Sequence, residues 1–390
     1  MTEVVAGKRV RIESVDVVRG VIMIIMSLDH VREFFSNAGF DPTDLARTNV
    51  PLFFTRWITH FCAPVFFLLT GTGAYLSLRK QSQAQLSRFL FTRGLWLIFL
   101  ELVVVRCLGW QFNFDYRLTL LIVLWALGWS MIVLSALIYM PVAWVAAFGV
   151  VIIAGHNLLD GMQSSNPIWS ILHSPGMVWS DGQHFVFALY PLIPWVGVTA
   201  AGYGLGQIFK WTPERRQEFL LRLGLGLTGA FVVLRAINIY GDPLRWSPQK
   251  SAVFTVLSFL NTNKYPPSVL YLLMTSGPAM LFLRAVDGGS PRWLRPALIV
   301  GKVPMFYYLL HVPLIHLIAV IVCYARYGQA HWMFESPSIE YFPFARPPDW
   351  GYSLPAVYLI WAFVVVALYP LCKWYAGLRQ RSSNSWLSYF

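Results

Sequence analysis

The sequence predicts an all-α integral membrane protein, a polytopic bundle of about ten transmembrane helices whose N- and C-termini both lie in the cytoplasm. Of its 390 residues, 57% are hydrophobic and only 12% are charged, and the mean hydropathy is +0.56. Apolar runs long enough to cross a hydrocarbon core of about 30 Å recur along the whole chain. Lysine and arginine gather in alternate connections between these runs. A soluble enzyme with a large core is the alternative, but it does not require so high a hydrophobic content.

The expected spans follow the apolar runs and the polar breaks between them. We place them at Val15–Phe35, Leu52–Leu78, Phe91–Phe112, Leu118–Met140, Val142–Ile153, Phe185–Phe209, Phe219–Ile239, Ser268–Leu283, Ala297–Cys323 and Ser353–Lys373. The fifth span is short, and Ser251–Asn261 fits an interfacial or re-entrant helix, so nine or eleven crossings stay open. Because no repeat of fixed period, Gly/Ser linker or low-complexity tract divides the chain, we expect one domain over residues 1–390.

The positive-inside rule orients this bundle. One side of the membrane receives the cations of both termini and of alternate connections, namely Lys8, Arg9, Arg11, Arg79, Lys80, Arg88, Lys210, Arg215, Arg216, Arg292, Arg295, Arg379 and Arg381. We take that side as cytoplasmic, which leaves the longer, acid-containing loops to form a vestibule on the other side. The first span carries no small-residue cleavage site, so we expect no removable signal peptide.

Several classes of function and site are disfavoured by composition. The net charge is +12, but the cations form no dense patch or binding motif, so we expect no nucleic-acid partner. No P-loop, GxSxG or HExxH motif is present. The eight histidines and four cysteines show no metal-ligand spacing, and we expect no metal. We assign the cysteines to packing: Cys62, Cys107, Cys323 and Cys372. A site would therefore be assembled from several helices.

The first span carries ionisable residues that hydrocarbon rejects. At 100° per residue, Arg19 and His30 project within about 20° of each other, roughly 16 Å apart along the axis. Asp16 lies one turn before Arg19, and Glu33 lies one turn after His30. This stripe should face protein or water. Arg19 fits either a structural pair with Asp16 or a functional contact. His30 fits either packing or general-base catalysis, with Asp29 or Glu33 tuning its charge.

The second span places Arg56 and His60 one turn apart on one face, with Pro64 a further turn on. Proline removes a backbone hydrogen bond, so a kink near a site is expected there. An ordinary membrane proline beside a hydrogen-bonded helix pair is the alternative. We weigh both interpretations equally.

Other ionisable residues are ambiguous. His311 lies deep in the ninth span, with His316 nearby, and is either a pathway residue or an interhelical hydrogen bond. For Glu101 and Arg106 in the third span we expect a structural ion pair. Asn263 and Lys264 directly precede the eighth span on the non-cytoplasmic side. There Lys264 either binds an anionic group or extends to the membrane interface.

Four blocks resemble one known family. The opening "RIESVDVVRGVIMIIMSLDHVREFF" resembles the start of the heparan-alpha-glucosaminide N-acetyltransferase catalytic-domain family, especially its bacterial members of unassigned function. "CAPVFFLLTGTGAYLS", "NKYPPSVLYLLMT" and "GKVPMFYYLLHVPL" agree with it in order, so the resemblance spans most of the chain. The spacing of Arg19 and His30 is also similar to a first-helix motif in the wider group of membrane acyltransferases that modify polysaccharides.

The resemblance implies an enzyme that takes acetyl groups from cytosolic acetyl-CoA and delivers them to a sugar amine or hydroxyl across the membrane. By position, His30 stands where lysosomal members have a functional asparagine, and Asn263 and Lys264 match an Asn-Lys pair. The chain departs from the lysosomal pattern in its first loop, residues 36–51, which carries Asp41 and Asp44 but no histidine. This departure counts against a heparan-type substrate and an acetyl-histidine step in that loop.

Our hypothesis is a membrane-bound N- or O-acyltransferase in the bacterial cytoplasmic (inner) membrane. Its co-substrate is acetyl-CoA or another acyl-CoA, its acceptor is a glycan or amino sugar, and membrane lipids surround it. The catalytic candidates are His30 as base, Asp29 or Asp41 to orient it, and His60 as a second base or carrier. The binding candidates are Arg19, Arg56, Asn263, Lys264 and His311, with Arg19 or Lys264 meeting a CoA phosphate or an anionic acceptor.

Two other classes of function stay open. The same intramembrane residues could form the relay of a proton-coupled transporter or flippase, although we find no inverted repeat. In a non-catalytic assembly or sensor protein they would only be packing determinants. The sequence leaves open the acceptor, direct transfer against an acyl-enzyme, and the oligomeric state, with a homodimer among the arrangements considered.

Overall fold

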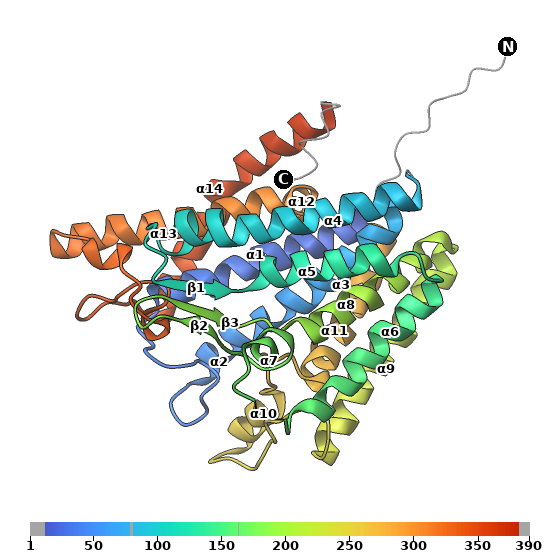
Figure 1. Cartoon of the computed structure of the whole chain (residues 1–390), viewed down its shortest axis with the longest axis horizontal. Helices are drawn as coiled ribbons and strands as arrows, with labels where there is room; N and C mark the ends of the chain where they lie inside the picture. The colour runs from blue at the N-terminus through green and yellow to red at the C-terminus, as the bar shows by residue number, and fades with distance from the viewer. Residues whose placement is uncertain (1–11, 79–80, 163, 382–390) are drawn as a thin grey trace.

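The computed structural model describes residues 12–78, 81–162 and 164–381 and is 71% helical, which confirms the all-α class. Part of the predicted orientation depends on residues outside this range: Lys8, Arg9, Arg11, Arg79 and Lys80. Figure 1 shows the long helices running past one another, with a small sheet and short helices at one end of several of them.

The charged first helix, α1 (Glu13–Phe35), lies inside the bundle. It packs against α12 (Arg295–Lys302), α13 (Pro304–Tyr327) and α14 (Leu354–Arg381). Two glycines allow the closest approach: a Cβ on Gly20 would lie 1.8 Å from the Ala297 carbonyl oxygen, and one on Gly301 would lie 1.8 Å from that of Asp16. Small residues let helix backbones touch. Protein therefore surrounds the polar stripe of α1.

The second predicted span is interrupted where its proline indicated. It consists of α2 (Val50–Trp57), a 3-10 segment (Ile58–Phe61) and α3 (Cys62–Ser77). Pro64 has no N–H to offer the carbonyl oxygen of His60, one turn earlier. That oxygen instead accepts a hydrogen bond from the Tyr271 hydroxyl, at 2.7 Å. The break is thus stabilised by a contact with a distant helix.

The remaining helices complete the bundle (Figure 1). They are α4 (Gln83–Phe99), which continues as a π-helix (Leu100–Trp110), α5 (Val123–Leu137), α6 (Val142–Gly155), α7 (Pro167–Leu172), α8 (Leu192–Leu205), α9 (Pro213–Ile237), α10 (Ala252–Leu260) and α11 (Val269–Asp287). Short 3-10 segments are η3 (His156–Leu159), η4 (Gly206–Lys210), η5 (Arg292–Leu294), η6 (His331–Phe334) and η7 (Ile339–Tyr341). The predicted ninth span divides into α12 and α13, because Pro304 disfavours helical backbone in the residue before it.

A three-stranded sheet differs from the expectation of helices alone. Its order is β1 (Leu118–Leu121), β3 (Phe185–Ala188), β2 (Gly176–Ser180), with β1 parallel to β3 and β2 antiparallel to it. Leu118 pairs with Phe185. Two predicted spans therefore begin as strands, and their helices start only at Val123 and Leu192. Short apolar runs do not distinguish a strand from a helix by pattern alone.

Seven helical segments of the described chain are long and apolar enough to cross a membrane: Val50–Ser77, Val142–Leu159, Leu192–Lys210, Pro213–Ile237, Val269–Asp287, Pro304–Tyr327 and Leu354–Arg381. Each corresponds to one of the ten predicted spans. The other three predictions fall on α1, on α4 with its π-helix, and on α5, which is apolar but shorter. The chain is an integral membrane protein, and the count of ten stays a prediction.

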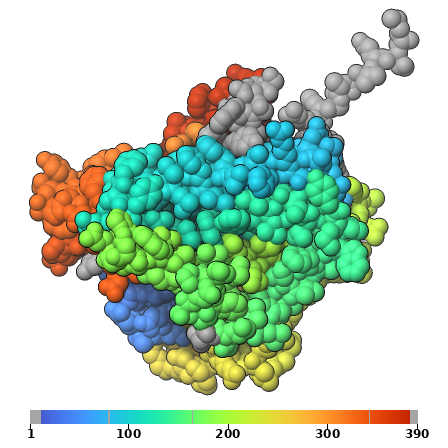
Figure 2. Space-filling model, viewed as in Figure 1, coloured from blue at the N-terminus to red at the C-terminus, as the bar shows by residue number. Residues whose placement is uncertain are grey.

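The outer faces of the long helices are apolar. Figure 2 shows the side of the molecule on which α4, α5 and α6 lie. Large hydrophobic side chains are exposed on these and neighbouring helices, among them Phe91, Leu95, Phe99, Trp144, Val150, Val151, Val232, Val233, Leu359, Phe363 and Val366. Helices that present apolar side chains outward satisfy their backbone hydrogen bonds internally, as lipid requires. The polar groups of the bundle consequently gather inside it.

Candidate active site

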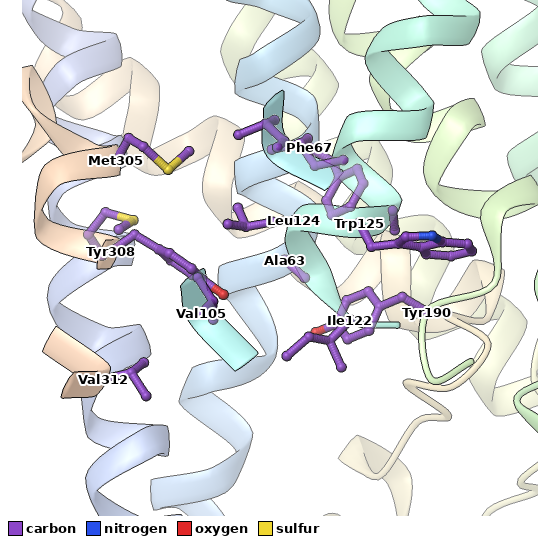
Figure 3. Packing of buried hydrophobic residues seen from close by; sticks show 14 of the residues in the cluster. Ala63, Phe67, Val105, Ile122, Leu124, Trp125, Tyr190, Met305, Tyr308 and Val312 are labelled. Carbon is purple, nitrogen blue, oxygen red and sulfur yellow. The ribbon is translucent and has the colours of Figure 1, made fainter. Parts of the chain in front are cut away.

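A cavity of about 90 Å³ lies inside the bundle, between α1, α3, the π-helix, α13 and the segments around the sheet. We call it the histidine cavity, because His30 lines it. Figure 3 shows Tyr308 and Tyr190 extending toward each other from opposite sides, with Ala63 and Ile122 beside Tyr190. The cavity thus joins chain segments more than two hundred residues apart.

His30 forms a pair with His311. Nδ1 of His30 lies 2.7 Å from Nε2 of His311, and the two rings are stacked with centroids 4.9 Å apart. Nδ1 of His311 lies 2.7 Å from the Tyr308 carbonyl oxygen and 3.1 Å from that of Tyr307. A carbonyl oxygen only accepts, so Nδ1 of His311 carries the proton in the neutral ring.

The tautomer of His311 determines that of His30. With its proton on Nδ1, neutral His311 presents a lone pair at Nε2, and Nδ1–H of His30 donates to it. The remaining ring nitrogen of His30, Nε2, then holds a lone pair and has no hydrogen-bond partner among the described residues. Trp110 packs edge-on against the His30 ring, with centroids 4.8 Å apart. The His30 ring is thus fixed in orientation, and its unprotonated Nε2 lies free beside the cavity.

Asp29 lines the same cavity but is engaged elsewhere. Its Oδ1 accepts hydrogen bonds from Arg32 at 2.9 and 3.2 Å, and its Oδ2 accepts one from Arg56. Arg32 also contacts Glu33, at 3.4 Å. These four residues form a buried ion cluster beside the histidine pair. The ring partner that the structure gives His30 is His311, where the sequence had suggested Asp29 or Asp41.

Three predicted site residues lie away from the cavity wall. His60 is buried, and its ring lies against Tyr271 with centroids 5.5 Å apart. Asp41 is exposed and accepts hydrogen bonds from the backbone and hydroxyl of Thr43. Asn263 donates its side-chain N–H to the Pro266 carbonyl oxygen at 3.0 Å. Asn263 therefore shapes the loop, while its neighbour Lys264 reaches the cavity.

Lys264 lines the histidine cavity from the loop before α11. Within the described chain its ammonium has no ion-pair or hydrogen-bond partner, and it lies 5.2 Å from the centroid of the Tyr265 ring. Asp242 holds this loop by accepting hydrogen bonds from Asn263 N at 2.9 Å and from Ser268 Oγ at 2.6 Å. Burial raises the pKa of Asp242, whereas these hydrogen bonds lower it. The cavity thus contains a cation without a direct partner, and the carboxylates of Asp29 and Glu33 line the same cavity.

Two further donors in the cavity wall were missed by sequence reasoning. The hydroxyl of Tyr308 and the indole N–H of Trp110 are buried without a hydrogen-bond partner in the described structure. A buried polar group left without a partner is costly, and such exceptions concentrate at functional sites. Both residues belong to aromatic-rich helices, where nothing in the sequence separates a site residue from a packing residue. Both residues line the histidine cavity, which makes their donors candidates for contact with a bound ligand.

A second cavity, of about 250 Å³, lies toward the other end of α1. We call it the basic cavity, since Arg19, Arg93, Lys302 and Arg379 line it. Arg19 contacts Asp16 at 3.1 Å, as one of its two interpretations expected, and it also lines this cavity. Phe66 lines both cavities, so it lies between them. Arg19 and His30, which share a face of α1, therefore lie at two different cavities that have Phe66 in common.

A third hollow, of about 460 Å³, lies beside the histidine cavity and shares Glu33 and Phe342 with it. We call it the loop vestibule, because residues 38–42 form part of its wall. Arg56 and Asp41 line it, which places these two predicted residues near the route to His30. Arg346 lines it as well and donates to the carbonyl oxygens of Glu33 and Ser36. Its wall carries charges of both signs.

Three polar residues of the third and ninth spans are structural. Glu101 accepts a hydrogen bond from the backbone N–H of Leu124 at 2.7 Å, and Arg106 contacts Asp115 at 3.0 Å. The expected ion pair of Glu101 with Arg106 is therefore wrong, because each has a nearer partner in the segments around β1. His316 lies 2.9 Å from the Gly109 carbonyl oxygen and 2.7 Å from that of Met333, which ties α13 to its neighbours.

Comparison with known proteins adds one finding. The family model described as heparan-alpha-glucosaminide N-acetyltransferase, catalytic, matches residues 11–234, which is more than half of the chain. The matched region contains Arg19, Asp29, His30 and Arg56. Lys264 and His311 lie beyond it, so the structure is what connects them to the matched region. A search of curated proteins found no match.

Proposed function

The chain belongs to the heparan-alpha-glucosaminide N-acetyltransferase catalytic family, and from this premise we propose that it transfers acetyl groups from acetyl-CoA to an amine or hydroxyl of a sugar. The observation that carries the proposal is the His30–His311 pair, whose free Nε2 lies beside a cavity between the basic cavity and the loop vestibule. A donor and an acceptor can then approach one nitrogen from opposite ends of the bundle.

In the proposed reaction His30 is the general base. Nε2 takes the proton of the acceptor N–H or O–H as the acceptor nitrogen or oxygen attacks the thioester carbonyl carbon. The tetrahedral intermediate then collapses, the C–S bond breaks, and the leaving sulfur takes the proton from Nε2. His311 keeps the ring oriented and shares the positive charge through the Nδ1–Nε2 hydrogen bond. No acyl-enzyme is needed in this scheme.

The tetrahedral oxyanion needs donors, and the histidine cavity contains them. Tyr308 and Trp110 each offer a buried N–H or O–H without a partner, and Lys264 offers an ammonium. Donors fixed before the reaction stabilise developing charge without reorganisation, which is usually the largest electrostatic contribution to catalysis. Lys264 can alternatively meet an anionic group of the acceptor. In both roles the Lys264 ammonium lies next to a negative charge.

We assign the acetyl-CoA phosphates to the basic cavity. Arginine matches phosphate geometry with paired N–H donors, and the cavity supplies Arg19, Arg93 and Arg379 together with Lys302. The positive-inside rule predicts that this end faces the cytoplasm, where acyl-CoA is made. The eleven residues from Arg19 to His30 span about 16 Å of helix, which an extended thioester arm passing Phe66 would bridge. The acceptor would enter through the loop vestibule.

One observation also favours a transporter. Cavities toward both ends of α1, with Phe66 in the wall of each, are compatible with alternating access to a central site. In that case the histidine pair would carry a proton and not activate an acceptor. The two functions differ in whether the C–S bond of the donor is broken.

The experiment uses the full chain in liposomes. Radiolabelled acetyl-CoA is supplied at one side and a panel of amino sugars and neutral sugars at the other, with His331→Ala as the control variant because His331 is exposed and lies outside all three cavities. The proposal expects label on at least one sugar and free CoA in equal amount. Solute crossing without thioester cleavage, with every acceptor, would support the transporter and overturn the transferase.

A further inference from the structure

A second histidine cluster lies outside all three cavities. His156 begins η3 at the end of α6, Asp160 follows one helical turn later, and His173 caps the end of α7. One ligand atom from each of the three lies within 4.8 Å of the others. They belong to the short elements beside the sheet, at the end of the bundle that also contains the loop before α11. Nothing in the proposed acetyl transfer uses them.

His156 is buried without a partner. Only 2% of its surface is exposed, and neither ring nitrogen has a hydrogen-bond partner in the described structure. The Pro267 carbonyl oxygen lies near the ring but outside hydrogen-bond geometry. A buried imidazole with two unsatisfied nitrogens is rare, because each lost its hydrogen bond to water on folding. A ligand bound at one nitrogen would remove the anomaly.

The other two residues are held where such a ligand would need them. Nε2 of His173 lies 3.6 Å from Oδ1 of Asp160, and Trp169 stacks on the His173 ring. Asn157 donates to Oδ2 of Asp160 at 2.8 Å, which leaves Oδ1 directed to the histidine. Carboxylates that bind metals are usually oriented by a hydrogen bond from a neighbouring group, here the Asn157 amide. The side chain of Asp160 is 22% exposed, so the cluster is open to solvent.

We propose that His156, Asp160 and His173 bind one divalent transition-metal ion, with zinc the best match. Two imidazoles and one carboxylate suit zinc, with water completing the tetrahedron. Calcium and magnesium prefer all-oxygen sets, so they fit poorly. Nε2 of His173 now donates to the His156 carbonyl oxygen at 2.8 Å. On binding, Nε2 gives up that proton, and Nδ1–H faces Ser174 Oγ, which lies 3.4 Å away.

The ion would cross-link the segments that support the loop carrying Lys264. It would join the end of α6 to α7, and Asn157 extends the connection because its Oδ1 accepts the backbone N–H of Val269 at 2.8 Å. Val269 is the first residue of α11, directly after the loop that holds Lys264. The site is therefore structural and separate from the histidine cavity. Its binding does not depend on the proposed transfer reaction.

The test measures metal binding to the purified full chain in detergent after chelator treatment. Co²⁺ is titrated first, because its visible absorption reports the ligands, and Zn²⁺ is then added in competition. The proposal expects one Co²⁺ per chain, displaced by one Zn²⁺. His156→Gln and Asp160→Asn should each weaken binding at least about tenfold. His184→Gln is the matched control, since His184 pairs with Asp181 in the same way, at 2.8 Å, but on the exposed turn between β2 and β3.

Thermal unfolding provides the second measurement. Zn²⁺ should raise the Tm of the unaltered chain and of His184→Gln, but much less that of Asp160→Asn, whose partly exposed side chain makes misfolding a small risk. If His156→Gln fails to fold, Asp160→Asn alone decides. Absence of stoichiometric binding to the unaltered chain overturns the proposal. Binding that is undiminished in Asp160→Asn, or lost in His184→Gln, overturns it as well.

Discussion

His30 and His311 are 281 residues apart in the chain, yet Nδ1 of the first lies 2.7 Å from Nε2 of the second. Backbone carbonyl oxygens of α13 fix the proton of His311, and His311 in turn fixes that of His30. Whether Nε2 of His30 is free therefore depends on how α1 and α13 pack together.

Replacing His311 by alanine removes the acceptor of the His30 Nδ1–H. We expect kcat for acetyl transfer to fall by about 10²- to 10⁴-fold, the usual range for a disabled base, while KM for acetyl-CoA changes little. His311→Gln offers an amide oxygen at a similar place and should restore part of kcat. Steady-state kinetics of both variants check this. Equal losses in kcat for alanine and glutamine, or a change confined to KM, would contradict a positioning role for His311.

Tyr308→Phe removes a hydroxyl that has no partner in the described structure. We expect kcat to fall at least about tenfold through loss of an oxyanion donor, while the Tm stays equal or rises because an unsatisfied buried group is gone. Tyr307→Phe is the control, since the Tyr307 hydroxyl donates to Ser27 Oγ at 2.9 Å. It should lose about 1 kcal/mol of stability and keep its kcat. The opposite pattern in the two variants would remove Tyr308 from the mechanism.

Arg93→Gln tests the basic cavity. Because this arginine lines the cavity assigned to the donor phosphates, we expect KM for acetyl-CoA to rise about tenfold, the equivalent of one charge-assisted hydrogen bond of about 1.4 kcal/mol. The KM for the sugar acceptor should not change. Arg88→Gln is the control, as Arg88 is exposed on the same helix and lines none of the three cavities. Equal effects of the two variants would place the donor elsewhere.

Arg56→Ala leaves Asp29 buried with one cation fewer. Removing one partner of a buried ion pair costs about 3–5 kcal/mol, and since Arg32 remains bound to Asp29, we expect the lower end of that range. Thermal unfolding in detergent measures the loss. Arg222→Ala breaks an exposed pair with Glu218 and should change stability by less than about 1 kcal/mol. A loss for Arg56→Ala no larger than for Arg222→Ala would show that the cluster contributes little.

The local features of single helices could be predicted from the sequence. The stripe on α1 that joins Arg19 to His30 follows from helical geometry, and the break near Pro64 follows from its missing N–H. Seven of the predicted spans correspond to helices fit to cross a membrane, since a length of about 20 apolar residues is a strong signal. The sequence predicts helix where the structure has β1 and β3, because a short apolar run satisfies both patterns.

Contacts between distant segments could not be predicted in this way. His311 was recognised as a candidate, but its pairing with His30 depends on how α13 packs against α1. Tyr308 and Trp110 have no spacing that separates them from the many packing aromatics. The cluster of His156 and Asp160 with His173 escaped notice because the third residue comes from another helix, across a loop. In each case the contact depends on tertiary packing, which a pattern in the sequence does not show.

The single-turnover rate of acetyl transfer by His30→Ala, measured with acetyl-CoA and the acceptor both saturating, tests the general-base role of His30 most directly. His331→Ala serves as the folded control. If Nε2 of His30 takes the proton of the acceptor, the rate falls by at least about 10²-fold while acetyl-CoA still binds. A His30→Ala variant that transfers acetyl groups at the unaltered rate would contradict a general-base role for His30.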